Sequence, residues 1–194
     1  DDSLDRRVST VGRVGPHLES KIIDPETGAT VPRGTPGELC TRGYSVMLGY
    51  WEQDDKTAEA IDRARWMHTG DLGVMDDEGY VFLKDRSANL IIAGGVNVYP
   101  AEIEGALLGH PSVRDIAVFG VPDPDLGEVA KACVQLADGH EPTDRLAEQL
   151  IAFTTENIAA YKAPRSVDFV DDLPRTPTGK LVKGDLRKRY WPEA

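Results

Sequence analysis

The sequence predicts a protein of mixed α and β structure in two parts: a β-rich part over residues 1–86, and an α+β part over residues 87–194. Up to residue 86, short apolar stretches alternate with turn-forming sequences such as "DPETG" and "DDEG", which is typical of strands joined by tight turns. From residue 87 onward, apolar runs of strand length alternate with helical patterns. This alternation favours a central sheet flanked by helices.

The first part is expected to contain three strands and one helix. The strands are predicted at residues 19–23, 37–41 and 79–84, where apolar runs lie between turn signals. The helix is predicted at 55–61, which reads "DKTAEAI".

The second part begins with a strand, "NLIIAGG", that runs into a glycine turn. A helix is predicted from Pro100, which suits a first helical turn, and Ile103 and Leu107 lie four apart on one face of it. Gly109 and Pro111 are the expected stop signals.

Further strands are predicted at "RDIAVFGV" (114–121), "EVAKACVQLA" (128–137) and "SVDFV" (166–170). Between the last two, Thr143 is expected to cap a helix that carries Leu146, Leu150 and Phe153 along one face.

The charge is acidic overall but uneven. A net charge of −11 argues against a general nucleic-acid binder, because phosphate contacts need a basic surface. Residues 87–161 carry 3 basic and 11 acidic side chains, whereas residues 162–194 carry 8 basic and 5 acidic ones. This basic tail suits a small anionic ligand, although Arg187, Lys188 and Arg189 are equally consistent with a solvated helix.

Cys40 and Cys133 both lie in strand-like contexts, so we expect them to be reduced and structural. The four histidines are scattered and there is no CxxC pair, so no metal site is predicted.

The longest apolar run is too short to span a bilayer, and no secretory signal is visible. We expect a cytoplasmic protein, with peripheral membrane association left open. The first residues, "DDSLDRR", lack an initiator Met, which is consistent with a piece of a longer protein.

The stretch "DLPRTPTGKLVK" (172–183) resembles a phosphate-binding loop at first sight. That motif requires a glycine five positions before its Gly-Lys pair and a hydroxyl residue after it. Pro174 and Leu181 occupy these positions, and Pro174 and Pro177 lack the amides that would cradle a phosphate. Lys180 is therefore predicted to stand on a stiff turn from which it can reach an anionic group.

Three other short stretches carry candidate site residues. In "WMHTGDLG", the carboxylate of Asp71 suits a ribose diol, but a turn-forming Asp is the alternative. Arg86 is a candidate ribose or phosphate contact, or a surface ion pair. Gly94 and Gly95 allow close approach of a ligand, or simply form a turn.

Taken in order, five motifs resemble the adenylate-forming superfamily of acyl-CoA synthetases, firefly-type luciferases and peptide-synthetase adenylation domains. They are "TRGYSVMLGYW", "WMHTGDLGVMDDEGYVFLKDR", "GGVNVYPAEIE", "FGVPDPDLGEVAKACV" and "YKAPRSVDFVDDLPRTPTGK". The resemblance runs almost end to end, and it is greatest to fatty-acyl- or aryl-CoA ligases. It implies that residues 1–86 end the large N-terminal AMP-binding domain and that residues 87–194 form its mobile C-terminal lid domain.

The resemblance also implies roles for the candidate residues. Asp71 would bind the ribose hydroxyls of ATP and of the acyl-adenylate, and Arg86 would add ribose or phosphate contacts. Lys180 would be the catalytic lysine that bridges the substrate carboxylate and the α-phosphate.

A second group of residues would serve the thiol acceptor. Gly94, Gly95 and Glu102 match the loop that, after a domain rotation, lines the tunnel for the pantetheine arm of CoA. The same family pattern places charged residues at the hinge, where this chain has Ala88 and Asn89.

The expected function is that of an ATP-dependent acyl-CoA synthetase, an acid–thiol ligase. It would use ATP, Mg²⁺, CoA and a carboxylic acid, most similar to a fatty acid, and release AMP and pyrophosphate. The alternatives are an adenylation domain that loads a carrier protein and a non-catalytic nucleotide-binding or interaction module on the same fold. The family's phosphate loop, acyl pocket and Mg²⁺ ligands lie upstream of these motifs. We therefore expect the last third of a ligase, inactive without the remainder of the N-terminal domain.

Overall fold

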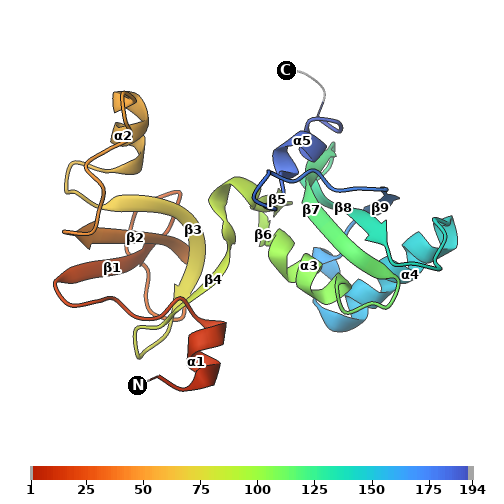
Figure 1. The fold of residues 1–194 in the computed structure, drawn as a ribbon, viewed down its shortest axis with the longest axis horizontal. Helices are drawn as coiled ribbons and strands as arrows, with labels where there is room; N and C mark the ends of the chain where they lie inside the picture. The colour runs from red at the N-terminus through yellow and green to blue at the C-terminus, as the bar shows by residue number, and fades with distance from the viewer. Residues whose placement is uncertain (1, 192–194) are drawn as a thin grey trace. The chain divides into compact units, whose positions relative to one another are not determined.

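The computed structural model describes residues 2–191 and divides into two compact units, residues 1–88 and 89–194. Each unit is built on its own sheet (Figure 1). Among the described residues, every helix is too short or too polar to traverse a lipid bilayer.

The first unit is a four-stranded antiparallel sheet with two short helices. Its strands pair in the order β1-β2-β3-β4. The elements are α1 (Leu4–Ser9), β1 (Leu18–Ile23), β2 (Gly37–Gly43), α2 (Asp54–Ala60), β3 (Met67–Met75) and β4 (Val81–Arg86). The first two predicted strands and the helix are confirmed. The third begins two residues later than expected, because the amide of Gly79 and the carbonyl of Asp76 close a turn before it.

The longest strand of this unit, β3, escaped the sequence analysis, which treated "WMHTGDLG" only as a motif. Gly70 and Gly73 interrupt its apolar pattern, and glycine weakens the strand signal. A register shift against β4 between Leu72 and Gly73 adds to the irregularity. Helix α1 was also not predicted.

The second unit is a five-stranded sheet with order β6-β5-β8-β7, and β9 pairs in parallel with β8. Its strands are β5 (Ile91–Ala93), β6 (Val96–Val98), β7 (Val113–Asp123), β8 (Gly127–Leu136) and β9 (Ser166–Phe169). Its helices are α3 (Pro100–Leu107), α4 (Asp144–Asn157) and α5 (Lys183–Arg187), with a 3₁₀ turn at Ala160–Lys162. Another 3₁₀ turn, Ser87–Asn89, spans the boundary between the two units.

Helices cover both faces of this sheet. Residues from α3 and α4, including Ile103 and Leu150, pack with one face of β7 and β8 in the main core. On the other face, Leu186 of α5 packs with Phe119 and Cys133 in a second, smaller cluster. The predicted fold class, a β-rich part followed by an α+β part with a flanked sheet, is confirmed.

The two longest helices form where the sequence predicted them. Pro100 begins α3, and Ile103 and Leu107 are fully buried. The hydroxyl of Thr143 accepts a hydrogen bond from the amide of Leu146 at 3.2 Å and so caps α4. These buried faces pack against the sheet of the second unit.

Candidate functional site

Lys180 lies on a tight hairpin, residues 175–181, which we call the Lys180 hairpin. The amide of Thr176 donates to the carbonyl of Lys180 at 2.8 Å, and the amide of Lys180 donates to the Thr176 hydroxyl at 3.0 Å. Gly179 has φ +84, a left-handed conformation that favours glycine. The loop is therefore a folded turn, as its prolines and glycine indicated, and it presents Lys180 to solvent.

Two ion pairs fasten this hairpin and the helix that follows it, α5, to the rest of the unit. On one side, Arg175 pairs with Asp115 of β7 and also donates to the carbonyl of Gly179 at 2.7 Å. On the other side, the ammonium of Lys183 lies 2.7 Å from Glu104 of α3, and both side chains are only 17% exposed. Glu104 itself accepts a hydrogen bond from the amide of Val118 at 2.6 Å. The hairpin is thus anchored to a strand and, through α5, to a half-buried carboxylate.

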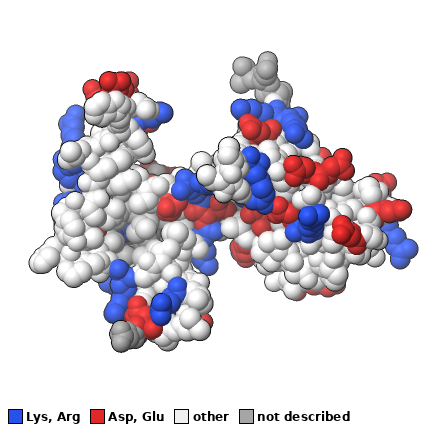
Figure 2. All heavy atoms as spheres, viewed as in Figure 1, with Lys and Arg blue, Asp and Glu red and all other residues white. Residues whose placement is uncertain are grey.

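Most of the basic side chains in the C-terminal tail are neutralised by carboxylates. Within the described residues, five ion pairs do this: Lys162–Glu102, Arg175–Asp115, Lys183–Glu104, Arg187–Glu128 and Lys188–Asp185. Figure 2 likewise shows acidic side chains beside basic ones on the face that it draws. The expectation that the whole basic tail suits an anion is therefore too broad. Carboxylates from segments earlier in the chain, which a count of charges within the tail leaves out, neutralise most of its basic side chains.

Lys180 differs from these paired cations. In the part of the chain that the structure describes, its ammonium makes no hydrogen bond or ion pair, and the residue is exposed. Arg187, by contrast, pairs with Glu128 and stacks over Trp191, so it is not a solvated charge. Lys188 is 82% exposed, as the alternative of a solvated helix predicted.

Asp71 and Arg86 face each other across strands β3 and β4. They are register partners, and Nε of Arg86 lies 3.2 Å from Oδ1 of Asp71. The hydroxyl of Thr69 donates its hydrogen bond to the carbonyl of Leu39 and therefore not to the carboxylate of Asp71. Since the Asp71 side chain is 28% exposed, its carboxylate remains accessible to a ligand. The surface ion pair considered for Arg86 is present, and its partner is Asp71, the residue proposed to bind the ribose hydroxyls.

Gly94 and Gly95 form the two-residue turn between β5 and β6. Their φ angles are +57 and +80, and Ala93 and Val96 pair on either side of them. Positive φ at both central residues is the mark of a type I′ hairpin, which strongly prefers glycine. The turn interpretation therefore accounts for both glycines, and the exposed position of the turn leaves room for a ligand as well.

Glu102 is held by a lysine. Both of its carboxylate oxygens lie 2.7 Å from the ammonium of Lys162. The hydrogen bond to Glu102 raises the pKa of Lys162, so this lysine stays charged. In this arrangement Glu102 ties α3 to the 3₁₀ turn that contains Lys162.

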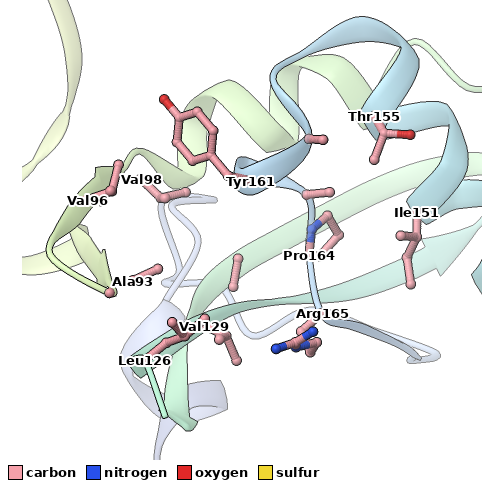
Figure 3. A pocket seen from close by; sticks show the side chains of 14 residues that line it. Ala93, Val96, Val98, Leu126, Val129, Ile151, Thr155, Tyr161, Pro164 and Arg165 are labelled. Carbon is pink, nitrogen blue, oxygen red and sulfur yellow. The ribbon is translucent and has the colours of Figure 1, made fainter.

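A cavity of about 580 Å³ lies beside the Gly94 turn, and Figure 3 shows its lining. Its walls are mostly apolar, with Tyr161 and Arg165 among the few polar side chains. They come from β5, β6, β8, α4 and the segment that leads into β9. Sequence analysis missed this cavity, because no single stretch of sequence contains its lining.

Comparison with known proteins gives two family matches. Residues 1–51 match the model described as AMP-binding enzyme, and residues 102–180 match the model described as AMP-binding enzyme C-terminal domain. The order of these matches agrees with the two units of the structure.

Individual relatives resemble nearly the whole chain. A mitochondrial medium-chain acyl-CoA ligase of Danio rerio is 46% identical over 97% of this chain and 30% of its own length. A 4-coumarate–CoA ligase-like protein of Oryza sativa subsp. japonica is 45% identical over 94% of this chain and 32% of its own length. The crystal structure of ATP-bound MatB from Rhodopseudomonas palustris matches with a TM-score of 0.84 at 38% identity, covering 94% of this chain and 36% of that chain.

These matches define the class of protein. The chain belongs to the adenylate-forming superfamily of AMP-binding enzymes. It corresponds to the C-terminal portion of such an enzyme: the end of the AMP-binding domain followed by the C-terminal domain. It spans about a third of the length of the relatives that it matches. The resemblance drawn from the five sequence motifs is confirmed.

Proposed function

We propose that this chain is the C-terminal portion of an ATP-dependent acid–thiol ligase. The parent protein would activate a carboxylic acid as an acyl-adenylate and transfer the acyl group to CoA, releasing pyrophosphate and AMP. The observation that carries the proposal is the exposed Lys180 ammonium, unpaired among the described residues, on an anchored hairpin. Its ligase relatives support the same proposal.

Adenylation brings a carboxylate to an α-phosphate, so two anions must approach each other. A positioned ammonium lowers this repulsion most where charge concentrates in the transition state. We assign this role to Lys180, because a lysine acts as a compact point charge. Asp71 would accept hydrogen bonds from the ribose hydroxyls, and Arg86 would hold that carboxylate while contacting ribose or phosphate.

Thiolation requires the arm of CoA to reach the acyl carbonyl. We propose that CoA passes beside the Gly94–Gly95 turn and lodges in the adjoining cavity of about 580 Å³. The apolar walls suit an adenine ring or a pantetheine chain, and the guanidinium of Arg165 suits a phosphate. Glu102 would act by fixing α3 near this turn through its pair with Lys162.

The acid is proposed to be a fatty acid. The Danio rerio relative is named for medium-chain acyl groups, whereas the Oryza sativa relative is named for 4-coumarate. Mg²⁺ would accompany ATP, and its protein ligands are assigned to the remainder of the parent protein. A cytoplasmic location, with or without peripheral membrane contact, is part of the same proposal.

The proposal is tested on the intact parent protein, supplied with ATP, Mg²⁺ and a series of fatty and aryl acids. We expect AMP and pyrophosphate to form only with an accepted acid, and an acyl-CoA thioester to appear when CoA is added. AMP formation with transfer only to a carrier protein would replace the ligase assignment with the carrier-loading one. Nucleotide binding without any AMP formation would favour the alternative of a non-catalytic nucleotide-binding module.

Replacing Asp71 with Asn in the parent protein is expected to weaken ATP binding by about 10- to 100-fold. A hydrogen bond to a charged acceptor contributes about 1.5–3 kcal/mol, and the amide retains only part of this. Isothermal titration with ATP measures the effect. Asp77→Asn is the matched control, because Asp77 lies on an exposed turn of the same unit. Equal affinities of the two variants would remove Asp71 from the nucleotide site.

A further inference from the structure

Strands β2 and β3 of the first unit bring three metal-binding side chains together. Cys40 of β2 and His68 of β3 are register partners, and Glu38 lies two residues before Cys40 on the same strand. Nδ1 of His68 lies 3.7 Å from Sγ of Cys40 and 3.1 Å from Oε2 of Glu38. The three ligand atoms all lie within 4.8 Å of one another.

We propose that Glu38, Cys40 and His68 bind one divalent cation of the Zn²⁺ or Co²⁺ type. With metal–nitrogen and metal–oxygen bonds near 2.0–2.2 Å and a metal–sulfur bond near 2.3 Å, a tetrahedral ion separates N from S by about 3.5 Å and N from O by about 3.3 Å. The distances of 3.7 and 3.1 Å lie close to both values. These two pairs would therefore need only small shifts to coordinate an ion, and the third pair, Sγ of Cys40 and the Glu38 carboxylate, lies within 4.8 Å and would close to about 3.5 Å.

The chemistry of the ligands selects the class of ion. A thiolate and an imidazole favour Zn²⁺ and its neighbours over Mg²⁺ or Ca²⁺, which prefer oxygen ligands alone. The Cys40 thiol would release its proton to solvent as the metal–sulfur bond forms. Three protein ligands leave a fourth position for water.

A second carboxylate, that of Asp62, lies beside the histidine. Oδ2 of Asp62 lies 4.0 Å from Nε2 of His68, and Oδ1 of Asp62 accepts a hydrogen bond from the amide of Trp66 at 2.9 Å. A carboxylate facing the second ring nitrogen is the usual outer partner of a metal-binding histidine. It would place the proton of the neutral ring on Nε2 and leave Nδ1 free for the ion.

Burial defines the route of entry. Cys40 is fully buried, whereas the side chains of Glu38 and His68 are 13% and 32% exposed. An ion would therefore arrive past His68.

The competing interpretation is a plain ion pair between Glu38 and a protonated His68 beside a thiol, and it predicts no bound metal.

The site lies next to Gly70, the residue that precedes Asp71 on β3. Oε1 of Glu38 accepts a hydrogen bond from the amide of Gly70 at 3.0 Å, while Oε2 faces His68. A bound ion would thus share the carboxylate that holds Gly70, and it would cross-link β2 to β3. This inference stands independently of the proposed ligase activity.

The test titrates Co²⁺ into the full chain after treatment with a chelator, and it follows the thiolate-to-cobalt charge-transfer absorption. We expect one equivalent to bind and Zn²⁺ to displace it. Cys40→Ser should abolish the band, while Cys133→Ser, which removes the other fully buried cysteine, should leave it unchanged. Asp62→Asn should weaken binding about 10-fold, because it changes only the outer partner.

The absence of the band in the native chain would overturn the proposal, as would its loss in Cys133→Ser. Circular dichroism checks that each variant is folded. If Cys40→Ser fails to fold, His68→Gln replaces it as the deciding variant. Native-like binding by a folded His68→Gln chain would also overturn the proposal.

Discussion

Lys180→Ala in the intact parent protein is expected to slow acid-dependent pyrophosphate release by about 10²- to 10³-fold. This is the usual effect of removing one preorganised donor that faces developing charge. The structure gives Lys180 no competing carboxylate among the described residues, and its exposed position leaves it available to the reacting groups. The loss should fall on kcat more than on the affinity for ATP, because the ammonium acts most strongly in the transition state.

The two half-reactions separate this role from a general loss of function. One assay follows pyrophosphate release, and the other supplies ready-made acyl-adenylate and follows thioester formation with CoA. The second rate should survive in Lys180→Ala. Lys188→Ala is the matched control, because Lys188 is 82% exposed and pairs only loosely, at 3.4 Å, with Asp185. If Lys180→Ala leaves both rates unchanged, Lys180 is a surface charge and the site assignment is wrong.

Leu150→Ala is expected to destabilise the second unit by about 2–5 kcal/mol. Leu150 is fully buried in the main core, and a Leu to Ala change in such a place loses the transfer free energy and leaves a cavity. Leu108→Ala serves as the control, because Leu108 is 51% exposed. Its free energy of unfolding should change by less than about 1 kcal/mol.

Denaturant unfolding measures this difference if the signal comes from the second unit alone. The chain has three tryptophans, and only Trp191 lies in that unit. In a background of Trp51→Phe and Trp66→Phe, the fluorescence of Trp191 therefore reports on it, since its indole donates to the carbonyl of Gly120 on β7. Equal effects of the two leucine substitutions would mean that Leu150 is not part of a close-packed core.

The elements that the sequence predicted are those with a long, regular pattern. Strands β7 and β8 and helices α3 and α4 carry continuous apolar runs or residues spaced at three and four, and each formed as expected. Strand β3 was missed because its glycines break the pattern. Short elements such as α1 have no buried residue, so their sequence carries little periodic signal.

The candidate site was predictable as a set of residues but not as an arrangement. Motifs put Asp71 and Lys180 forward as candidates, because each lies inside a short characteristic stretch, and their roles stay predictions. The anchors of the Lys180 hairpin were not predictable: Arg175 lies 60 residues from Asp115 in sequence, and only the fold brings them together. The same holds for Cys40 and His68, which are 28 residues apart and meet through strand register.

The anchored hairpin has a consequence for conformational entropy. Ordering the backbone of one residue costs about 1–2 kcal/mol, so ordering the hairpin, residues 175–181, on arrival of a ligand would cost about 7–14 kcal/mol. In its proposed role, the ammonium itself would contribute only about 2.7–4 kcal/mol. Because the hairpin is already folded and tied to Asp115 and Glu104, the remaining cost is that of fixing one lysine side chain, about 2 kcal/mol. On a disordered loop of the same sequence, the lysine would cost more free energy to order than its charge contributes.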